Sequence, residues 1–206
     1  MFAQFLATSE IREQHTLLDV GVSSDQTYDH SNYVEAWYPY KYRITAAGID
    51  RAEFLESRYP GVKYVWADGR DLPFEDNAFD FVHSSAVLEH VGSRAMQARF
   101  LRELWRVARC GIFVTTPNRW FPIEFHTLIP FAHWLPPRIF RALLRLTGRD
   151  FFADESNLNL LTRQSLQAIA VDAEINSPLL EHVSLLGWPT NLLLLATKRS
   201  SGATAA

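Results

Sequence analysis

The chain has 206 residues, 48% of them hydrophobic, and a formal net charge of −3. This length predicts one domain that buries about 70% of its unfolded surface and folds without a metal or disulfide. The near balance of charges disfavours a broad surface for nucleic-acid phosphates. The single cysteine, Cys110, the lack of an export leader and the lack of a stretch long enough to span a bilayer indicate a cytoplasmic protein.

Strand-like and helix-like segments alternate along the first 118 residues, which is typical of a doubly wound α/β sheet. Apolar runs predict five strands, at 16–20, 44–49, 62–66, 79–84 and 111–115. Helical periodicity and turn signals predict helices at 33–40, 52–58 and 94–108, the last one preceded by the segment 86–91.

Residues 119–156 break this alternation with eight large aromatic side chains and four prolines, and we expect an irregular insertion with a helix near 138–146. We favour an aromatic lid that excludes water from a reaction. The alternative is peripheral contact with a membrane surface, because the helix has a cationic side formed by Arg138, Arg141, Arg145 and Arg149.

The regular pattern resumes with Thr162, a predicted N-cap for a helix over 163–173. Strands at 181–186 and 191–198, separated by a turn at 187–190, predict an antiparallel hairpin. The sequence therefore predicts a Rossmann-like, doubly wound seven-stranded sheet, mostly parallel with a C-terminal antiparallel hairpin. It forms one domain over 1–199, and we expect a disordered tail at 200–206.

Ligands of open α/β sheets bind outside the carboxyl ends of the strands, and four such ends carry suitable residues. Gly21, after the first strand, lets the backbone approach a ligand closely. Asp50 follows the second strand, where a carboxylate accepts hydrogen bonds from ribose hydroxyls. Asp68 follows the third strand and can accept from an adenine amine, and Ser84 is expected to line the floor beneath the reactive end of a cofactor.

The loop after the first strand lacks the G-x-G-x-x-G pattern of dinucleotide-binding proteins. Ser23 and Asp25 occupy positions where glycines are expected, and Asp25 would place a carboxylate where phosphate oxygens bind. The chemistry of the loop therefore disfavours a pyrophosphate.

Residues 67–91 carry a resemblance to a known family, in the run ADGRDLPFEDNAFDFVHSSAVLEHV. With LRELWRVARCGIFVTTPN at 101–118, this run is similar to class I S-adenosylmethionine-dependent methyltransferases of the small quinone-methyltransferase-like type, methyltransferase type 11. The resemblance covers nearly the whole chain and implies S-adenosylmethionine as cofactor. It implies that Asp19 and Gly21 belong to the loop that binds the donor and that Asp50 is the acid that binds the ribose. It also implies that Asp68 contacts the adenine and that the backbone of Gly69 lies beside the adenine.

The stretch from Gly21 to Asp50 is longer than the roughly 20 residues of a compact strand–helix–strand unit. We expect the surplus to remodel the donor loop, so that Ser23, Ser24 or Asp25 contacts the ammonium or carboxylate of the donor.

Methyl transfer from a sulfonium by in-line displacement needs alignment, and it needs a base only where the acceptor must lose a proton. Glu124 and His126 lie two apart in the insertion, and we predict His126 as that base with Glu124 orienting it. The alternative is that the two residues only fix the lid. His90 is expected to cap a helix end. The scattered histidines lack metal-ligand spacing, so the sequence predicts no metal site.

Three functions follow from these patterns. The favoured one is methyl transfer from S-adenosylmethionine to a small-molecule or glycan- or lipid-linked acceptor. A catalytically silent donor-binding protein is the second. An NAD-dependent oxidoreductase is the third, and the missing G-x-G-x-x-G and the terminal hairpin count against it. The sequence does not predict the oligomeric state.

Overall fold

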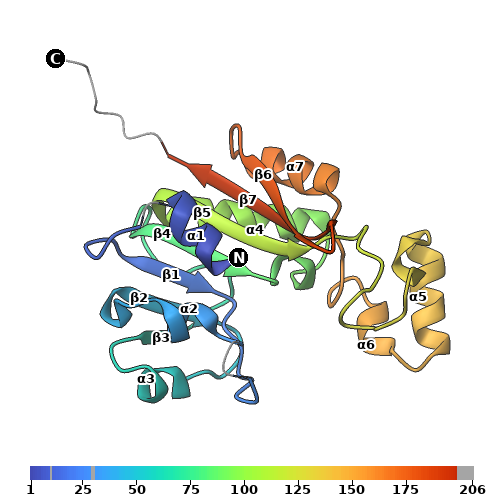
Figure 1. Cartoon of the computed structure of the whole chain (residues 1–206), viewed down its shortest axis with the longest axis horizontal. Helices are drawn as coiled ribbons and strands as arrows, with labels where there is room; N and C mark the ends of the chain where they lie inside the picture. Colours follow the sequence, from blue (N-terminus) through green and yellow to red (C-terminus); the bar gives the residue numbers. More distant parts are fainter. Residues whose placement is uncertain (10, 29–30, 199–206) are drawn as a thin grey trace.

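The computed structural model describes residues 1–9, 11–28 and 31–198 and contains a seven-stranded sheet in the order β3-β2-β1-β4-β5-β7-β6 (Figure 1). Strands β1 to β5 run parallel, β7 is antiparallel to β5, and β6 is antiparallel to β7. The predicted fold is therefore confirmed. The strands are β1 (Leu17–Val20), β2 (Ile44–Gly48), β3 (Lys63–Trp66), β4 (Phe79–Ser85), β5 (Ala108–Pro117), β6 (Leu179–Leu185) and β7 (Trp188–Thr197).

The helices of the described residues are α1 (Phe2–Ser9), α2 (Tyr33–Trp37), α3 (Phe54–Arg58), α4 (Arg94–Val107), α5 (Pro137–Leu146), α6 (Asp150–Ala153) and α7 (Arg163–Asp172). Three single turns of 3₁₀ helix add η1 (Lys41–Arg43), η2 (Leu88–His90) and η3 (Ala132–Trp134). Of the segment 86–91, Leu88–His90 forms the short 3₁₀ turn η2. Residues 2–9 were not predicted as a helix, and α1 forms because Phe5 packs on Phe113 of β5, with 5.3 Å between ring centroids.

The sheet carries an apolar core on each face. Successive β-strand residues point to opposite faces, so Leu18 of β1 joins the core under α4 and α7, while Leu17 joins the core under α1, α2 and α3. All four residues of β1 are buried. The predicted N-cap is confirmed, since the Thr162 side chain accepts a hydrogen bond from the backbone N–H of Ser165 in a capping box.

The C-terminal hairpin turns at Leu186 and Gly187, which both have positive φ, 52° and 81°. Two residues with positive φ form the tight turn that matches strand twist. The turn predicted at 187–190 was wrong, since Trp188 already begins β7. The sequence misled because Pro189 normally ends a strand, whereas here it pairs with Ser184 beside an irregularity in the β6–β7 register.

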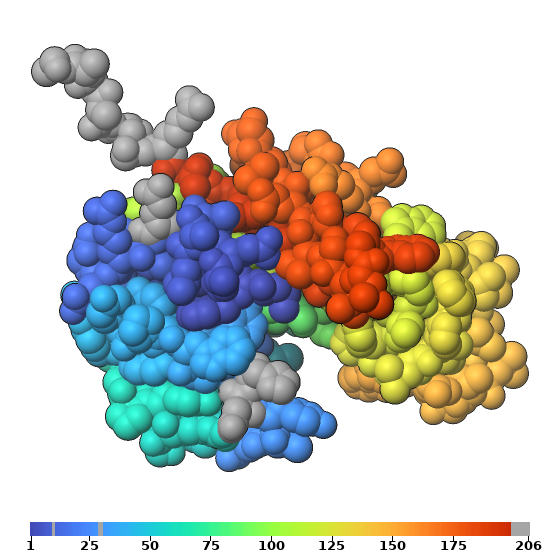
Figure 2. Space-filling model, in the orientation of Figure 1, coloured from blue at the N-terminus to red at the C-terminus, as the bar shows by residue number. Residues whose placement is uncertain are grey.

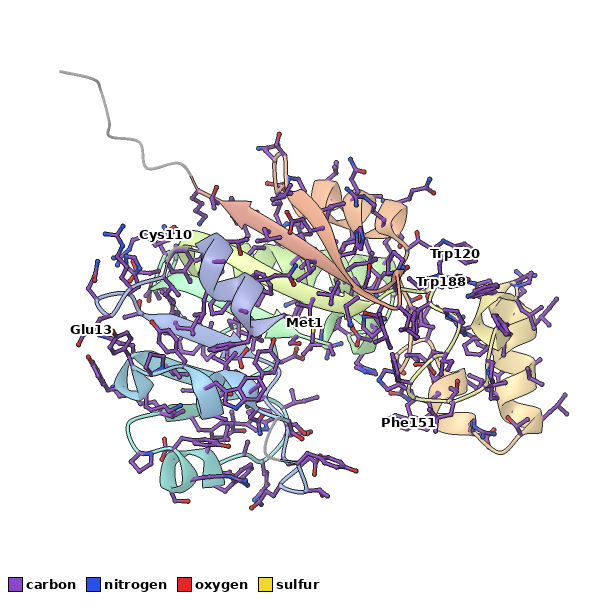
Figure 3. All side chains as sticks on the ribbon, viewed as in Figure 1. Met1, Glu13, Cys110, Trp120, Phe151 and Trp188 are labelled. Atoms are coloured by element: carbon purple, nitrogen blue, oxygen red, sulfur yellow. The ribbon has the colours of Figure 1, made fainter. Side chains whose placement is uncertain are left out.

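The insertion, predicted over 119–156, stands beyond the carboxyl end of β5 and the amino end of β7 (Figure 1). It has its own small core, in which Phe140 and Leu144 of α5 pack with Ala153 of α6. Trp120 and Trp188 lie together where β7 meets the insertion, and the Trp188 indole N–H donates to the Trp120 carbonyl at 3.1 Å (Figure 3).

Figure 2 shows a hollow between the insertion, in yellow, and the part of the molecule that contains β2 and β3, in light blue and blue-green. Within the described residues, none of the helices is long and apolar enough to cross a membrane. The tail predicted as disordered, 200–206, lies outside the described residues.

Candidate functional site

The loop after β1 turns at Gly21, whose φ is +96°. Its N–H donates to the Ala47 carbonyl at 2.7 Å. A Cβ atom at this position would lie 2.1 Å from Cγ2 of Val87, in the segment that follows β4. Glycine is therefore required here both by the backbone conformation and by the close approach of the two strand ends.

Asp19 lies beneath this loop rather than on its surface. Its Oδ1 atom is 2.6 Å from Nδ1 of His83, and the hydroxyl of Tyr33 is 2.8 Å from Nε2 of the same ring. Burial raises the pKa of Tyr33, so its hydroxyl stays protonated and donates to the ring, whose Nδ1–H then donates to Asp19. Sequence reasoning missed His83 and Tyr33, although a histidine inside the apolar run FDFVHS was a usable signal.

Glu35 of α2 is a second buried acid near Asp19 and was also missed. Burial first, and then the charge of Asp19, raise the pKa of Glu35 well above its usual range. Neither carboxyl oxygen has a hydrogen-bond partner within the described part of the chain. Burial and the Asp19 charge therefore both favour the neutral form of Glu35.

Ser23 and Asp25 hold the loop in shape. The Ser23 N–H donates to Oδ1 of Asn32 at 2.8 Å, and the Asp25 N–H donates to the Ser23 hydroxyl at 3.0 Å. The Asp25 carboxylate accepts from the N–H of Thr27 at 2.8 Å and from the hydroxyl of Ser31 at 3.0 Å. These side chains thus replace the missing glycines with an internally bonded loop.

Asp50 is exposed directly after β2, and the loop brings Ser24 to it. The Ser24 hydroxyl and N–H lie 3.3 and 3.4 Å from Oδ2 of Asp50. Ile49 and the indole of Trp66 are exposed beside it, and the indole N–H donates to the Ile49 carbonyl at 2.9 Å. A carboxylate next to two apolar surfaces matches the polar and apolar parts of an adenosine.

Asp68 lines a hollow of about 570 Å³ with Trp66, Met96 and Arg99. Its carboxylate forms a double contact with Arg70, with Nη2 to Oδ2 at 2.7 Å and Nε to Oδ1 at 2.9 Å. The hydrogen bonds from Arg70 lower the pKa of Asp68, so the acid remains ionised.

Gly69 is fixed by packing. A Cβ atom there would lie 2.4 Å from Cε2 of Phe100 and 2.9 Å from Cγ1 of Val20. Ser84 is fully buried, and its hydroxyl donates to the Val20 carbonyl at 2.8 Å, so it braces β1 and does not line a surface. The half-buried neighbour, Ser85, shares a hydrogen bond of 2.9 Å with Thr115.

Glu124 and His126, the predicted pair, are in contact. Oε1 of Glu124 lies 2.5 Å from Nδ1 of His126, and the carboxylate also accepts from the N–H groups of His126 and Thr127 at 2.9 and 2.7 Å. Burial tends to raise the pKa of Glu124, but these hydrogen bonds outweigh it and lower the pKa to about 2. Glu124 is therefore ionised, and it orients the ring.

The other nitrogen of the His126 ring contacts η2 outside the insertion. Its Nε2 atom lies 3.0 Å from Nε2 of His90. Nδ1 of His90 lies 2.6 Å from the Asn157 carbonyl oxygen. Beside them Glu89 is fully buried, with Oε2 accepting from Thr116 at 2.8 Å. We call Glu89, His90, Glu124 and His126 the Glu-His cluster. His90 was predicted only as a helix cap, and the contact between its ring in η2 and the His126 ring of the insertion was not predicted.

Comparisons with known proteins bear on the family and the fold. A family model described as a methyltransferase domain matches residues 18–115. Two probable S-adenosylmethionine-dependent methyltransferases of Mycobacterium tuberculosis are 42% identical over 67 residues, which cover 32% of this chain and 23% of each of theirs. The matched region, residues 18–115, is a methyltransferase domain.

A demethylmenaquinone methyltransferase of Roseiflexus is 32% identical over 143 residues, covering 66% of this chain and 54% of that one. The chain thus spans between about a quarter and about half of the curated relatives it matches. A solved structure of an S-adenosylmethionine-dependent methyltransferase from Methanosarcina mazei has a TM-score of 0.55 at 17% identity, over 94% of this chain and 96% of that one, which shows the shared fold. Glu124 and His126 lie outside the residues that the family model matches.

Proposed function

We propose that this chain transfers a methyl group from S-adenosylmethionine to an acceptor held between the ends of β4 and β5 and the insertion. The observation that carries the proposal is the exposed Asp50 carboxylate next to Ser24 and the Gly21 loop. These residues lie at the carboxyl edge of the parallel strands, where the strand order reverses between β1 and β4 and where ligands of such sheets bind.

On this proposal Asp50 accepts the ribose hydroxyls and the exposed Trp66 indole packs near the adenine. Asp68 accepts from the adenine amine on the side not taken by Arg70, and the Gly69 backbone lies beside the ring. The methionine end occupies the loop of Gly21, which Ser23 and Asp25 shape through their internal hydrogen bonds. Asp19 and Ser84 act from below, as positioning residues.

The acceptor proposed is a small molecule or a glycan- or lipid-linked one, because the insertion exposes apolar side chains. Phe125, Leu128 and Phe131 are 54%, 67% and 53% exposed. Surfaces of this kind favour an acceptor with an apolar part. The Roseiflexus relative is named for demethylmenaquinone, so a quinone-type acceptor is one compound to include in a screen.

The chemistry needs the acceptor atom in line with the bond from sulfur to the methyl carbon, and such positioning lowers the activation barrier by about 7–11 kcal/mol. The electron pair of the acceptor forms the new bond, and the donor leaves as neutral S-adenosylhomocysteine. An acceptor hydroxyl or amine loses a proton, which we propose is taken up at the Glu-His cluster. The pair of Glu124 and His126 acts there together with His90, because His90 faces the remaining ring nitrogen of His126.

Calorimetric titration of the protein with S-adenosylmethionine, S-adenosylhomocysteine and NAD tests the donor half of the proposal. We expect both adenosyl compounds to bind and NAD not to bind. Binding of NAD alone would favour the oxidoreductase reading. Formation of S-adenosylhomocysteine over a panel of acceptors tests the second half, and donor binding with no turnover on any of them would favour a silent donor-binding protein.

A further inference from the structure

The two histidine rings of the Glu-His cluster meet through the same kind of nitrogen, Nε2, at 3.0 Å. Nδ1 of His90 faces the carbonyl oxygen of Asn157, which can only accept, so this nitrogen carries a hydrogen. Nδ1 of His126 carries one for the same reason, because it faces the Glu124 carboxylate. With both rings neutral, each presents a lone pair at Nε2, and two lone pairs at this distance repel; either a shared proton or a metal ion between them removes that repulsion.

A buried carboxylate oxygen is available at the same place. Oε1 of Glu89 lies 3.8 Å from Nε2 of His90, and it has no hydrogen-bond partner within the residues that the structure describes. A buried polar atom without a partner destabilises the folded state. The ligand atoms of Glu89, His90 and His126 all lie within 4.8 Å of one another, so one ion can satisfy all three.

Two imidazole nitrogens and one glutamate oxygen are a recurring ligand set for zinc. Ligand atoms on a tetrahedral zinc ion, at about 2.0–2.1 Å from it, are roughly 3.3 Å apart. Nε2 of His90 lies 3.0 Å from Nε2 of His126 and 3.8 Å from Oε1 of Glu89, and these two distances bracket that value.

The surroundings of the rings also suit a metal. Histidine ligands usually donate their other ring N–H to a carboxylate or a backbone carbonyl, which fixes the ring and its tautomer. His126 has Glu124 in this role, and His90 has the Asn157 carbonyl. Glu89 is held by the Thr116 hydroxyl, so each of the three ligands has an orienting contact.

We propose that Glu89, His90 and His126 bind one divalent transition-metal ion, with zinc the best match, and that Glu124 and Asn157 orient the two rings. The side chains of His90 and His126 are 33% and 25% exposed, so the ion reaches the site from solvent. Three protein ligands leave a fourth position open to water or to an oxygen atom of another molecule.

The place of the ion suggests its use, and this step rests on the proposed function. Val87, which packs against Gly21 of the donor loop, precedes His90 by three residues. An ion at the cluster therefore lies on the acceptor side of the donor site. A bound hydroxyl has a lower pKa than a free one, so the ion would favour an oxygen acceptor that releases its proton to solvent on binding, in place of proton uptake by the His126 ring, whose Nε2 atom would then be a ligand.

The test uses tag-free protein treated with a chelator and dialysed. Zn²⁺ binding is measured by calorimetry, and Co²⁺ binding is measured by visible absorption, which reports coordination geometry. We expect one ion per chain with a tetrahedral Co²⁺ spectrum. His90→Ala and His126→Ala should each weaken Zn²⁺ binding more than 10-fold. Glu124→Gln should weaken it about 10- to 100-fold, the usual effect of an orienting contact.

His182→Ala is the matched control, since it removes an exposed histidine of β6 and should leave Zn²⁺ binding unchanged. Binding of S-adenosylhomocysteine and the melting temperature report whether each variant is folded. His126→Gln serves as a milder change if His126→Ala fails to fold.

The proposal is overturned if the folded wild-type protein binds no stoichiometric Zn²⁺, which would assign the space between the rings to a shared proton. It is also overturned if binding is unchanged in folded His90→Ala and His126→Ala. The donor titration is independent of this result. Zn²⁺ binding without donor binding would remove the proposed function and leave the metal site.

Discussion

The Nδ1 atom of His83 in β4 lies 2.6 Å from the Oδ1 atom of Asp19 in β1, and both side chains are buried. The two residues are also partners in the register of the parallel pair. The contact therefore adds a side-chain bond to the backbone pairing of the two strands, directly below the loop of Gly21. Three aromatic rings, those of Phe5, Tyr33 and Phe113, pack around His83.

His83→Ala should lower the free energy of unfolding by about 3 kcal/mol. It leaves the Asp19 carboxylate buried without its partner and opens a cavity beside Phe113. Urea unfolding followed by circular dichroism measures the change. The exposed His182→Ala should shift it by less than about 0.5 kcal/mol. Equal stability of His83→Ala and the wild-type protein would contradict a bracing role for the contact.

Asp50→Ala should weaken the binding of S-adenosylhomocysteine by about 1.5–3 kcal/mol, because a carboxylate that accepts from ribose hydroxyls makes charge-assisted hydrogen bonds. Stability should change little, since Asp50 is exposed. Calorimetric titration measures the affinity, with Glu181→Ala on the edge strand β6 as a control that keeps wild-type binding. Wild-type affinity in Asp50→Ala would remove the ribose assignment.

Gly69→Ala should lower the free energy of unfolding by about 1–3 kcal/mol through overpacking against Phe100. The added Cβ would lie 2.4 Å from Cε2 of that ring. In a Phe100→Leu background the same change should cost less, because the shorter side chain leaves room. A double-mutant cycle in urea checks this, and an equal cost in both backgrounds would show that the contact is not the reason for glycine.

Stability should depend on pH through Asp80 at the start of β4. Burial tends to raise the pKa of Asp80, but hydrogen bonds from Thr16 and Arg109 outweigh burial and leave the pKa below its usual value. A lowered pKa in the folded state means that the unfolded chain takes up the proton first. The stabilisation is thus complete above the unfolded pKa of about 3.9 and is lost as pH falls through the folded pKa.

Urea unfolding between about pH 5 and pH 2 measures this contribution. The Asp80→Asn variant has no carboxylate to protonate at this position. Its free energy of unfolding should therefore decrease less steeply than that of the wild-type protein as the pH is lowered. The exposed Asp150→Asn should follow the wild-type profile. A profile for Asp80→Asn as steep as the wild-type one would place the acid sensitivity elsewhere.

Hydrophobic pattern and turn signals were enough for the sheet, because strands buried on both faces leave continuous apolar runs such as GIFV in β5. They failed where tertiary contacts overrule local preference. Residues 2–9 form α1 only because Phe5 has a place in the core, and Pro189 stays in β7 because the β6–β7 register shifts beside it. Local sequence does not contain either contact.

The sequence by itself determined the strand ends and hence the positions of Gly21, Asp50 and Asp68. The carboxyl ends of parallel strands lie at one edge of the sheet, and this does not depend on the side-chain contacts made there. The sequence also paired Glu124 with His126, which are close in the chain. Only the tertiary structure decided that His126 meets His90 and Glu89. These residues come from segments far apart in the sequence, and their chemistry depends on distances of a few ångströms that no local pattern encodes.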